Sequence, residues 1–124
     1  MADKVLIVDD SVSMRQMESL ILKAGGYEVV EAANGKEGVA RLTDDIKVVI
    51  TDYNMPEMNG IEFIEAVRGG TVNRSVPILM VTTESEAEKK QEGKRAGATG
   101  WLTKPFEQDQ LLRAIRKVAA PADF

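Results

Sequence analysis

Short apolar segments, each followed directly by polar or charged residues, are the feature that most constrains the fold of this chain. Residues 48–50 are three β-branched apolar residues in a row, and Thr51 and Asp52 follow them. A continuous apolar run of this length is typical of a strand buried on both faces, as in a parallel sheet covered by helices. Residues 5–8 and 77–81 are comparable runs, and weaker strand patterns cover residues 28–31 and 99–103. The sequence therefore predicts a buried parallel sheet.

Helical patterns fill the intervals between these segments. Either Ser11 or Ser13 can cap a first helix that ends at the glycines of residues 25–26. Its apolar residues at helical spacing are Met14, Met17, Leu20, Ile21 and Ala24. Further helices are predicted after Asn34, with Val39 and Leu42 buried, after Asn59, and over residues 84–96 and 108–118. Strict alternation predicts an α/β fold, a doubly wound parallel sheet of five strands with five helices in a single domain over residues 1–124.

The composition excludes several kinds of chemistry. The chain has no Cys and no His, which excludes disulfides, thiolate or His-ligated metal sites and a Ser-His-Asp triad. Acids and bases are mixed along the sequence, and the net charge is -4 at pH 7, so nucleic acid is not expected as a direct partner. No signal-peptide pattern is present, and no apolar run approaches the ~20 residues of a membrane span. A cytoplasmic protein without membrane contact is expected.

Acidic, hydroxyl and ammonium groups follow the predicted strands. Asp9 and Asp10 follow the first apolar run, Asp52 ends the central one, and Thr82 and Lys104 follow two others. The carboxyl ends of parallel strands meet at one edge of a sheet, where ligands bind. Clustered carboxylates repel one another, and a Mg²⁺ ion would relieve that repulsion. The set suits phosphoryl transfer with Asp52 as the nucleophile.

Several motifs together give the chain a specific family resemblance. They are residues 8–11, residues 52–56 with Asn59-Gly60, residues 81–84, residues 97–98 and residues 104–106. With them the chain resembles the response-regulator receiver domains of the chemotaxis, CheY-like type over essentially its whole length. The resemblance implies a flavodoxin-like fold with strand order 2-1-3-4-5.

The resemblance also implies a role for each site residue. Asp52 is the expected phosphoacceptor, and Mg²⁺ would be bound by Asp10, Asp52 and the Asn54 backbone carbonyl, with Asp9 acting mainly through water. Phosphoryl oxygens would be bound by Lys104, the Thr82 hydroxyl and the Thr83 backbone N–H. Asn54 and Glu84 match positions that tune phosphate lifetime. Trp101 occupies the aromatic switch position, and the Lys104–Pro105 peptide bond is expected to be cis.

Two positions depart from the family pattern. Thr83 stands where a small residue such as Ala is usual, and Trp101 stands where Tyr or Phe is frequent. The helix predicted over residues 84–96 has little large apolar surface, which fits either an ordinary solvated surface helix or a helix held loosely so that it can shift.

The expected function is that of a two-component response regulator, a switch that catalyses its own phosphorylation and dephosphorylation and is not an enzyme in the usual sense. A monomer is expected, with a histidine kinase as phosphodonor and a phosphatase as a further partner. Because no effector domain follows the last helix, the expected output is a protein target such as a flagellar-motor switch component. Alternatives are a phosphate sink or a phosphorelay intermediate. A flavodoxin-like electron carrier and an aspartyl phosphatase are rival interpretations.

Overall fold

The computed structural model describes residues 2–83 and 88–119. Within these residues, five parallel strands form one sheet in the order β2-β1-β3-β4-β5. The strands are β1 (Lys4–Val8), β2 (Glu28–Ala32), β3 (Ile46–Asp52), β4 (Ile78–Thr83) and β5 (Gly100–Lys104). The predicted sheet and its strand order are confirmed.

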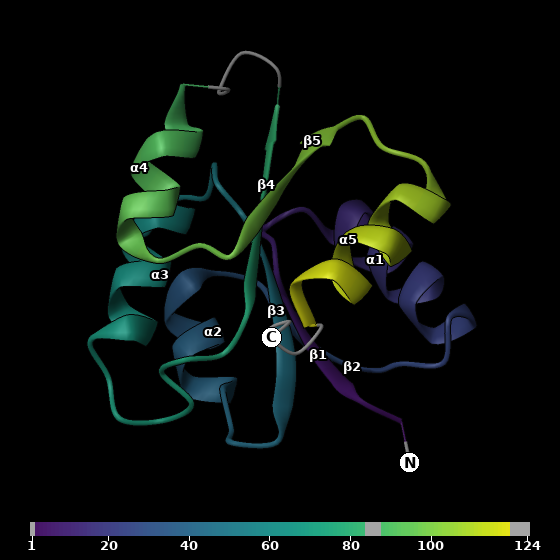
Figure 1. Cartoon of the computed structure of the whole chain (residues 1–124), viewed down its shortest axis with the longest axis horizontal. Helices are drawn as coiled ribbons and strands as arrows, with labels where there is room; N and C mark the ends of the chain where they lie inside the picture. The colour runs from purple at the N-terminus through teal and green to yellow at the C-terminus, as the bar shows by residue number, and fades with distance from the viewer. Residues whose placement is uncertain (1, 84–87, 120–124) are drawn as a thin grey trace, which may run out of the picture.

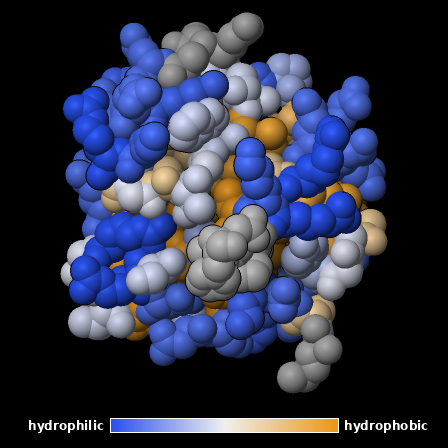
Figure 2. Space-filling view, viewed as in Figure 1, coloured by the Kyte–Doolittle hydropathy of each residue, from blue (hydrophilic) through white to orange (hydrophobic). Residues whose placement is uncertain are grey.

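Helices cover both faces of the sheet. They are α1 (Val12–Ala24), α2 (Gly35–Arg41), α3 (Gly60–Arg68), α4 (Lys89–Ala96) and α5 (Gln108–Ala119). Figure 1 shows α2, α3 and α4 on one face and α1 and α5 on the other. In the same view the outer surface is mostly hydrophilic, and hydrophobic residues show mainly as an interrupted band in the middle (Figure 2). Among the described helices, none combines the length and the apolar character that crossing a membrane requires.

The sheet separates two hydrophobic clusters. Alternate residues of a strand point to opposite faces, so β1 contributes Leu6 and Val8 to one cluster and Val5 and Ile7 to the other. The first cluster packs against Phe63 of α3, and the second includes Leu111 of α5. In β3, Val48, Val49 and Ile50 are at most 1% exposed. The central apolar run is therefore buried on both faces, as predicted.

The buried faces of two helices differ from the prediction. Ser11 caps α1 by accepting a hydrogen bond from the Met14 N–H, but Leu20 is 70% exposed. The buried side of α1 carries Glu18 and Leu22, one helical turn apart. In α2, Val39 is 40% exposed although Leu42 is buried.

Close helix packing explains the exposure of Val39. Gly35 and Gly38 are the buried residues of α2, and a Cβ atom on Gly38 would lie 2.8 Å from Phe63 and 2.9 Å from Val8. Two glycines therefore let the α2 backbone approach the core. Val39, next to Gly38 in the helix, is turned toward solvent.

Helix α4 has few buried side chains. Gly93 is its buried residue, and its N-cap residue, Glu88, makes no side-chain capping hydrogen bond. The helix ends at Gly97, whose φ of 115° is a left-handed conformation that favours glycine. Glu86, which stands four residues before Lys90 in the sequence, lies outside the described residues, whereas Lys89 pairs with Glu92 at 3.4 Å. These contacts fit a helix that is anchored weakly.

Candidate functional site

The parallel sheet brings the ends of its strands to one edge. Asp9 follows β1, Asp52 ends β3 and Lys104 ends β5. In the register of the sheet, Asp52 pairs with Val81 of β4, and Thr83 pairs with Lys104. Figure 1 shows this edge toward the top of the view, where β4 and β5 end. Residues far apart in the sequence thus become neighbours.

Three carboxylates form a cluster at this edge. One oxygen each of Asp9, Asp10 and Asp52 lies within 4.8 Å of the others. Asp9 is 1% exposed and Asp52 is 7% exposed, whereas Asp10 is exposed to solvent. Hard carboxylate oxygens from two buried groups and one exposed group fit a small divalent cation that keeps part of its water shell.

Local hydrogen bonds hold the first of these carboxylates. The Ser11 N–H donates to Asp9 Oδ1 at 2.9 Å, and the Arg15 guanidinium donates to the Asp9 carbonyl at 2.7 Å. Burial raises the pKa of Asp9, while the Ser11 hydrogen bond and the Lys104 charge oppose that rise. The start of α1 therefore positions the Asp9 side chain.

An ion pair crosses the sheet edge beside the cluster. Lys104 Nζ lies 3.2 Å from Asp52 Oδ1, and the two side chains are 21% and 8% exposed. The Lys104–Pro105 peptide bond is cis, as predicted. The ammonium group of this partly buried lysine next to Asp52 can neutralise negative charge that develops there.

The loop after Asp52 is anchored to β4 and α3. The Tyr53 N–H donates to the Val81 carbonyl at 2.9 Å, and the Gly60 N–H donates to the Tyr53 carbonyl at 2.8 Å. Asn59 and Glu62 form a reciprocal capping box at the start of α3. Asn54 lies in this loop with its side chain exposed. Backbone contacts therefore fix the position of Asp52.

Thr82 lies at the carboxyl end of β4 with its side chain fully buried. Its exposure is 0%, and within the described residues its hydroxyl oxygen has no hydrogen-bond partner. A buried hydroxyl without a partner is costly, and a group that offered it an acceptor would relieve that cost. Thr83 follows at the edge and is partly buried. Glu84, the other predicted residue of this segment, lies outside the described residues.

Comparisons with known proteins agree with this geometry. A family model described as the response regulator receiver domain matches residues 5–116. A chemotaxis protein CheY homolog of Campylobacter jejuni is 39% identical over 118 residues, covering 93% of this chain and 91% of that protein. Chemotaxis protein CheY1 of Helicobacter pylori is 38% identical over 123 residues, covering 97% of this chain and 99% of that protein. The chain belongs to the response regulator receiver domain family.

A solved structure supports the same assignment. The chemotaxis response regulator CheY4 of Vibrio cholerae superposes with a TM-score of 0.87 and is 51% identical. The match covers 95% of this chain and 99% of that structure. The chain is thus a CheY-like receiver domain in fold and sequence, and receiver domains are signalling switches, not enzymes in the usual sense.

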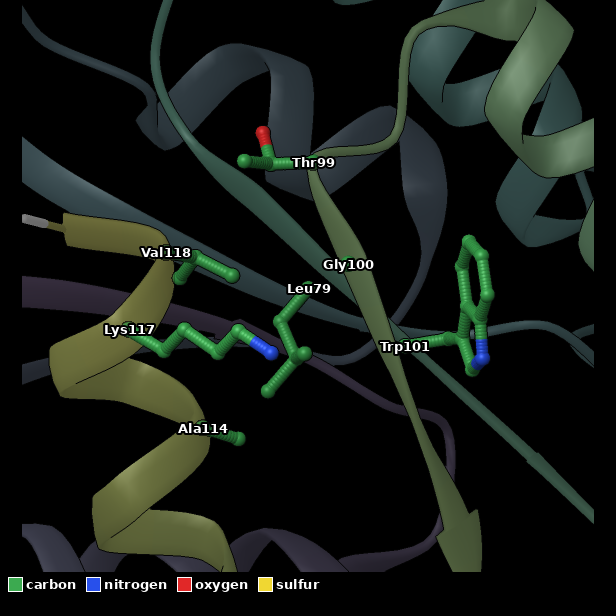
Figure 3. Close-up of a pocket in the computed structure, with 7 residues that line it drawn as sticks. All are labelled: Leu79, Thr99, Gly100, Trp101, Ala114, Lys117 and Val118. Carbon is green, nitrogen blue, oxygen red and sulfur yellow. The ribbon is translucent and has the colours of Figure 1, made fainter. Parts of the chain in front are cut away.

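In this receiver domain Trp101 and Thr82 lie on neighbouring strands, β5 and β4, as predicted. Thr82 pairs with Thr103 across β4 and β5, and Trp101 pairs with Met80. Figure 3 shows the Trp101 ring on the opposite side of β5 from the α5 residues that line a pocket of ≈ 380 Å³. The ring is 38% exposed, and Lys90 Nζ of α4 lies 5.9 Å from its centre. A cation–π contact therefore joins α4 to Trp101 in its outward position.

The sequence analysis missed one buried ionisable residue of the receiver domain. Glu18 of α1 is 1% exposed, and neither of its carboxyl oxygens has a hydrogen-bond partner among the described residues. Burial, with the nearby charge of Asp9, raises the pKa of Glu18 to about 8. Its spacing gave a signal, because Glu18 lies four residues after Met14 and four before Leu22, and that spacing defines one helix face.

Glu18 makes stability depend on pH. Its folded pKa of about 8 exceeds the ordinary value of 4.5, so its contribution to folding is full below pH 4.5 and is lost as pH rises to about 8. In Mg²⁺-free buffer, Glu18→Gln should leave the free energy of unfolding nearly unchanged at about pH 5 and raise it by roughly 1–4 kcal/mol at about pH 8.5. Urea denaturation measures both values. Glu65→Gln, an exposed change on α3, is the control. If Glu18→Gln changed the free energy of unfolding equally at both pH values, a raised pKa of Glu18 would be contradicted.

Proposed function

We propose that this receiver domain is a phosphorylation-controlled switch in which Asp52 accepts a phosphoryl group from the phosphohistidine of a histidine kinase. The observation that carries the proposal is the Lys104 ammonium 3.2 Å from Asp52 Oδ1, beside the acidic cluster. Phosphoryl transfer depends mainly on positioning and on neutralising charge, and these residues supply both.

The proposed reaction forms an acyl phosphate. An oxygen of the Asp52 carboxylate attacks phosphorus, and the phosphorus–nitrogen bond of the donor breaks as the imidazole leaves. Lys104 stabilises the negative charge on the phosphoryl oxygens, and the Thr82 hydroxyl and Thr83 backbone N–H donate to other oxygens. Asn54 and Glu84 are proposed to tune the lifetime of the product.

Mg²⁺ is the proposed cofactor of this site. Asp10, Asp52 and the Asn54 backbone carbonyl would hold it directly, and Asp9 would act mainly through water. The fit rests on hard oxygen groups that lie within 4.8 Å of one another. When bound, the ion supplies positive charge that offsets the repulsion among the carboxylates and the phosphoryl group.

The proposed switch connects Thr82 to Trp101. The buried hydroxyl of Thr82 lacks a partner among the described residues, and a phosphoryl oxygen on Asp52 would give it an acceptor. Movement of Thr82 toward Asp52 would vacate space on the side of β5 where Trp101 lies. Trp101 would then shift inward and leave its contact with Lys90 on the weakly anchored α4.

The proposed pathway is chemotaxis, because relatives that match nearly the full length of this chain are named chemotaxis proteins. The proposed output is binding of the phosphorylated form to a downstream protein such as a flagellar-motor switch component. A phosphate sink or phosphorelay intermediate is the alternative role. We also propose that residues 1–124 form a single receiver domain and that the protein is a monomer. A phosphatase partner and a cytoplasmic location stay predictions.

Phosphorylation of Asp52 can be measured without the kinase. With acetyl phosphate and Mg²⁺, the protein should gain one phosphoryl group by intact-protein mass spectrometry. Asp52→Asn should abolish the gain, because an amide cannot act as the nucleophile. The control Asp109→Asn, at an exposed position of α5, should label like the wild type. Full labelling of Asp52→Asn would show that Asp52 is not the phosphoacceptor.

The switch can be followed by fluorescence, since Trp101 is the single tryptophan of the chain. Beryllofluoride with Mg²⁺ should change the emission or quenching of Trp101. Thr82→Ala should lose most of that change while Asp52 still accepts phosphate, because the hydroxyl that responds to the phosphoryl group is gone. Thr71→Ala, an exposed position outside the site, is the control. A response of full size in Thr82→Ala would rule out transmission through this threonine.

A further inference from the structure

Glu18 occupies a position where an apolar side chain would be expected. It lies on the buried side of α1 with Leu22 and belongs to the largest fully buried side chains of the described residues. Neither carboxyl oxygen has a hydrogen-bond partner there. An ionised carboxylate without a partner is very costly in such a place, whereas a protonated one costs less.

The face of the sheet that α1 covers also carries residues of the candidate site. Val5 and Ile7 of β1 point toward α1 and α5, and Asp9 continues that alternation two residues later. In β3, Ile50 points to the same face, and Asp52 follows two residues later. Glu18, Asp9 and Asp52 therefore lie on one side of the sheet.

Three charged groups act on the Glu18 carboxyl, one from each of the strand ends at β1, β3 and β5. Burial is the largest cause of its raised pKa, Asp9 and Asp52 raise it further, and Lys104 opposes them. Leu111 and Ile115, the α5 residues buried on this face, carry no charge. Glu18 therefore holds a proton at neutral pH because its surroundings are apolar and the nearest acids outnumber the nearest base.

We propose that Glu18 gives up its proton when a divalent cation enters the acidic cluster, so that cation binding depends on pH. This inference rests on the proposed Mg²⁺ site of Asp9, Asp10 and Asp52. A dication offsets the negative charge of Asp9 and Asp52, and it thereby favours the ionised form of the neighbouring carboxyl. The O–H bond of Glu18 breaks, the electron pair stays on the carboxylate, and the proton passes to the buffer.

The consequence is a rise in Mg²⁺ affinity with pH. Because a proton is released on binding, affinity should increase by up to about tenfold per pH unit as the pH approaches about 8 from below, and it should level off above that pH. The chain has no His and no Cys, the side chains that most commonly titrate near neutral pH. Any protons that Asp9 releases on Mg²⁺ binding are released both by the wild type and by variants of Glu18. The difference in proton release between the two proteins therefore belongs to Glu18.

Isothermal titration calorimetry with MgCl₂ tests the proposal. Titrations at about pH 7 in two buffers with different ionisation enthalpies count the protons released per Mg²⁺ bound. Wild type should release roughly one proton more than Glu18→Gln, whose amide imitates the protonated acid. The exposed control Glu65→Gln should match the wild type. Equal proton release in wild type and Glu18→Gln would overturn the proposal.

A second measurement on the wild type needs no variant. Carbon NMR of the glutamate carboxyl groups should show one group titrating near pH 8 without Mg²⁺ and at lower pH with saturating Mg²⁺. A midpoint that Mg²⁺ leaves unchanged would refute the coupling to Glu18 while leaving the metal site intact. Absence of Mg²⁺ binding at every pH would contradict the proposed function and, with it, this coupling.

Discussion

Burial of β3 between β1 and β4 determines where the candidate chemistry can take place. The Val48–Ile50 segment is almost completely removed from water, and its parallel pairing on both sides fixes the direction in which the strand ends. Asp52 is the last residue of that strand, so its backbone is held by the sheet and its carboxyl lies at the edge. The apolar core thus positions an acid that the core itself could not accommodate.

The edge of the sheet where these strands end carries more acidic groups than basic ones. Asp9, Asp10 and Asp52 bring three carboxylates together. Burial, and to a smaller extent the charges of Asp9 and Asp52, raise the pKa of Glu18, and the Lys104 ammonium opposes that rise. This surplus of acid is destabilising unless protons or cations compensate for it. Protonation of Glu18 is one form of compensation, and the geometry of the other three acids favours a cation. In this account the same electrostatic imbalance supports both metal binding and its dependence on pH.

Much of the fold could be predicted because each apolar run is short, buried and followed by a residue that belongs in water. Parallel strands bring such residues together without any knowledge of side-chain contacts, which explains why Asp9, Asp52 and Lys104 were found. The faces of the helices were harder to predict. The approach of α2 to the core depends on Gly35 and Gly38, which an apolar pattern ignores, so Val39 was wrongly placed.

Apolar patterns also failed to identify Glu18 as a buried residue. A pattern that counts apolar residues gives no weight to an acid, although the spacing from Met14 to Leu22 puts Glu18 on the buried face. Trp101 likewise makes a cation–π contact with Lys90, and strand patterns contain no information about such a contact between α4 and β5. Packing between elements, more than the pattern within one, decides these positions.

The central claim is that Asp52 is the phosphorylated residue and that Lys104 and Thr82 bind the oxygens of its phosphoryl group. A crystal structure of the protein with Mg²⁺ and beryllofluoride tests it most directly. The account predicts beryllium bonded to an Asp52 carboxylate oxygen, with Lys104 Nζ and the Thr82 hydroxyl each within hydrogen-bond distance of a fluoride. Beryllofluoride bound at another residue, or bound to Asp52 without contact to Thr82, would contradict it.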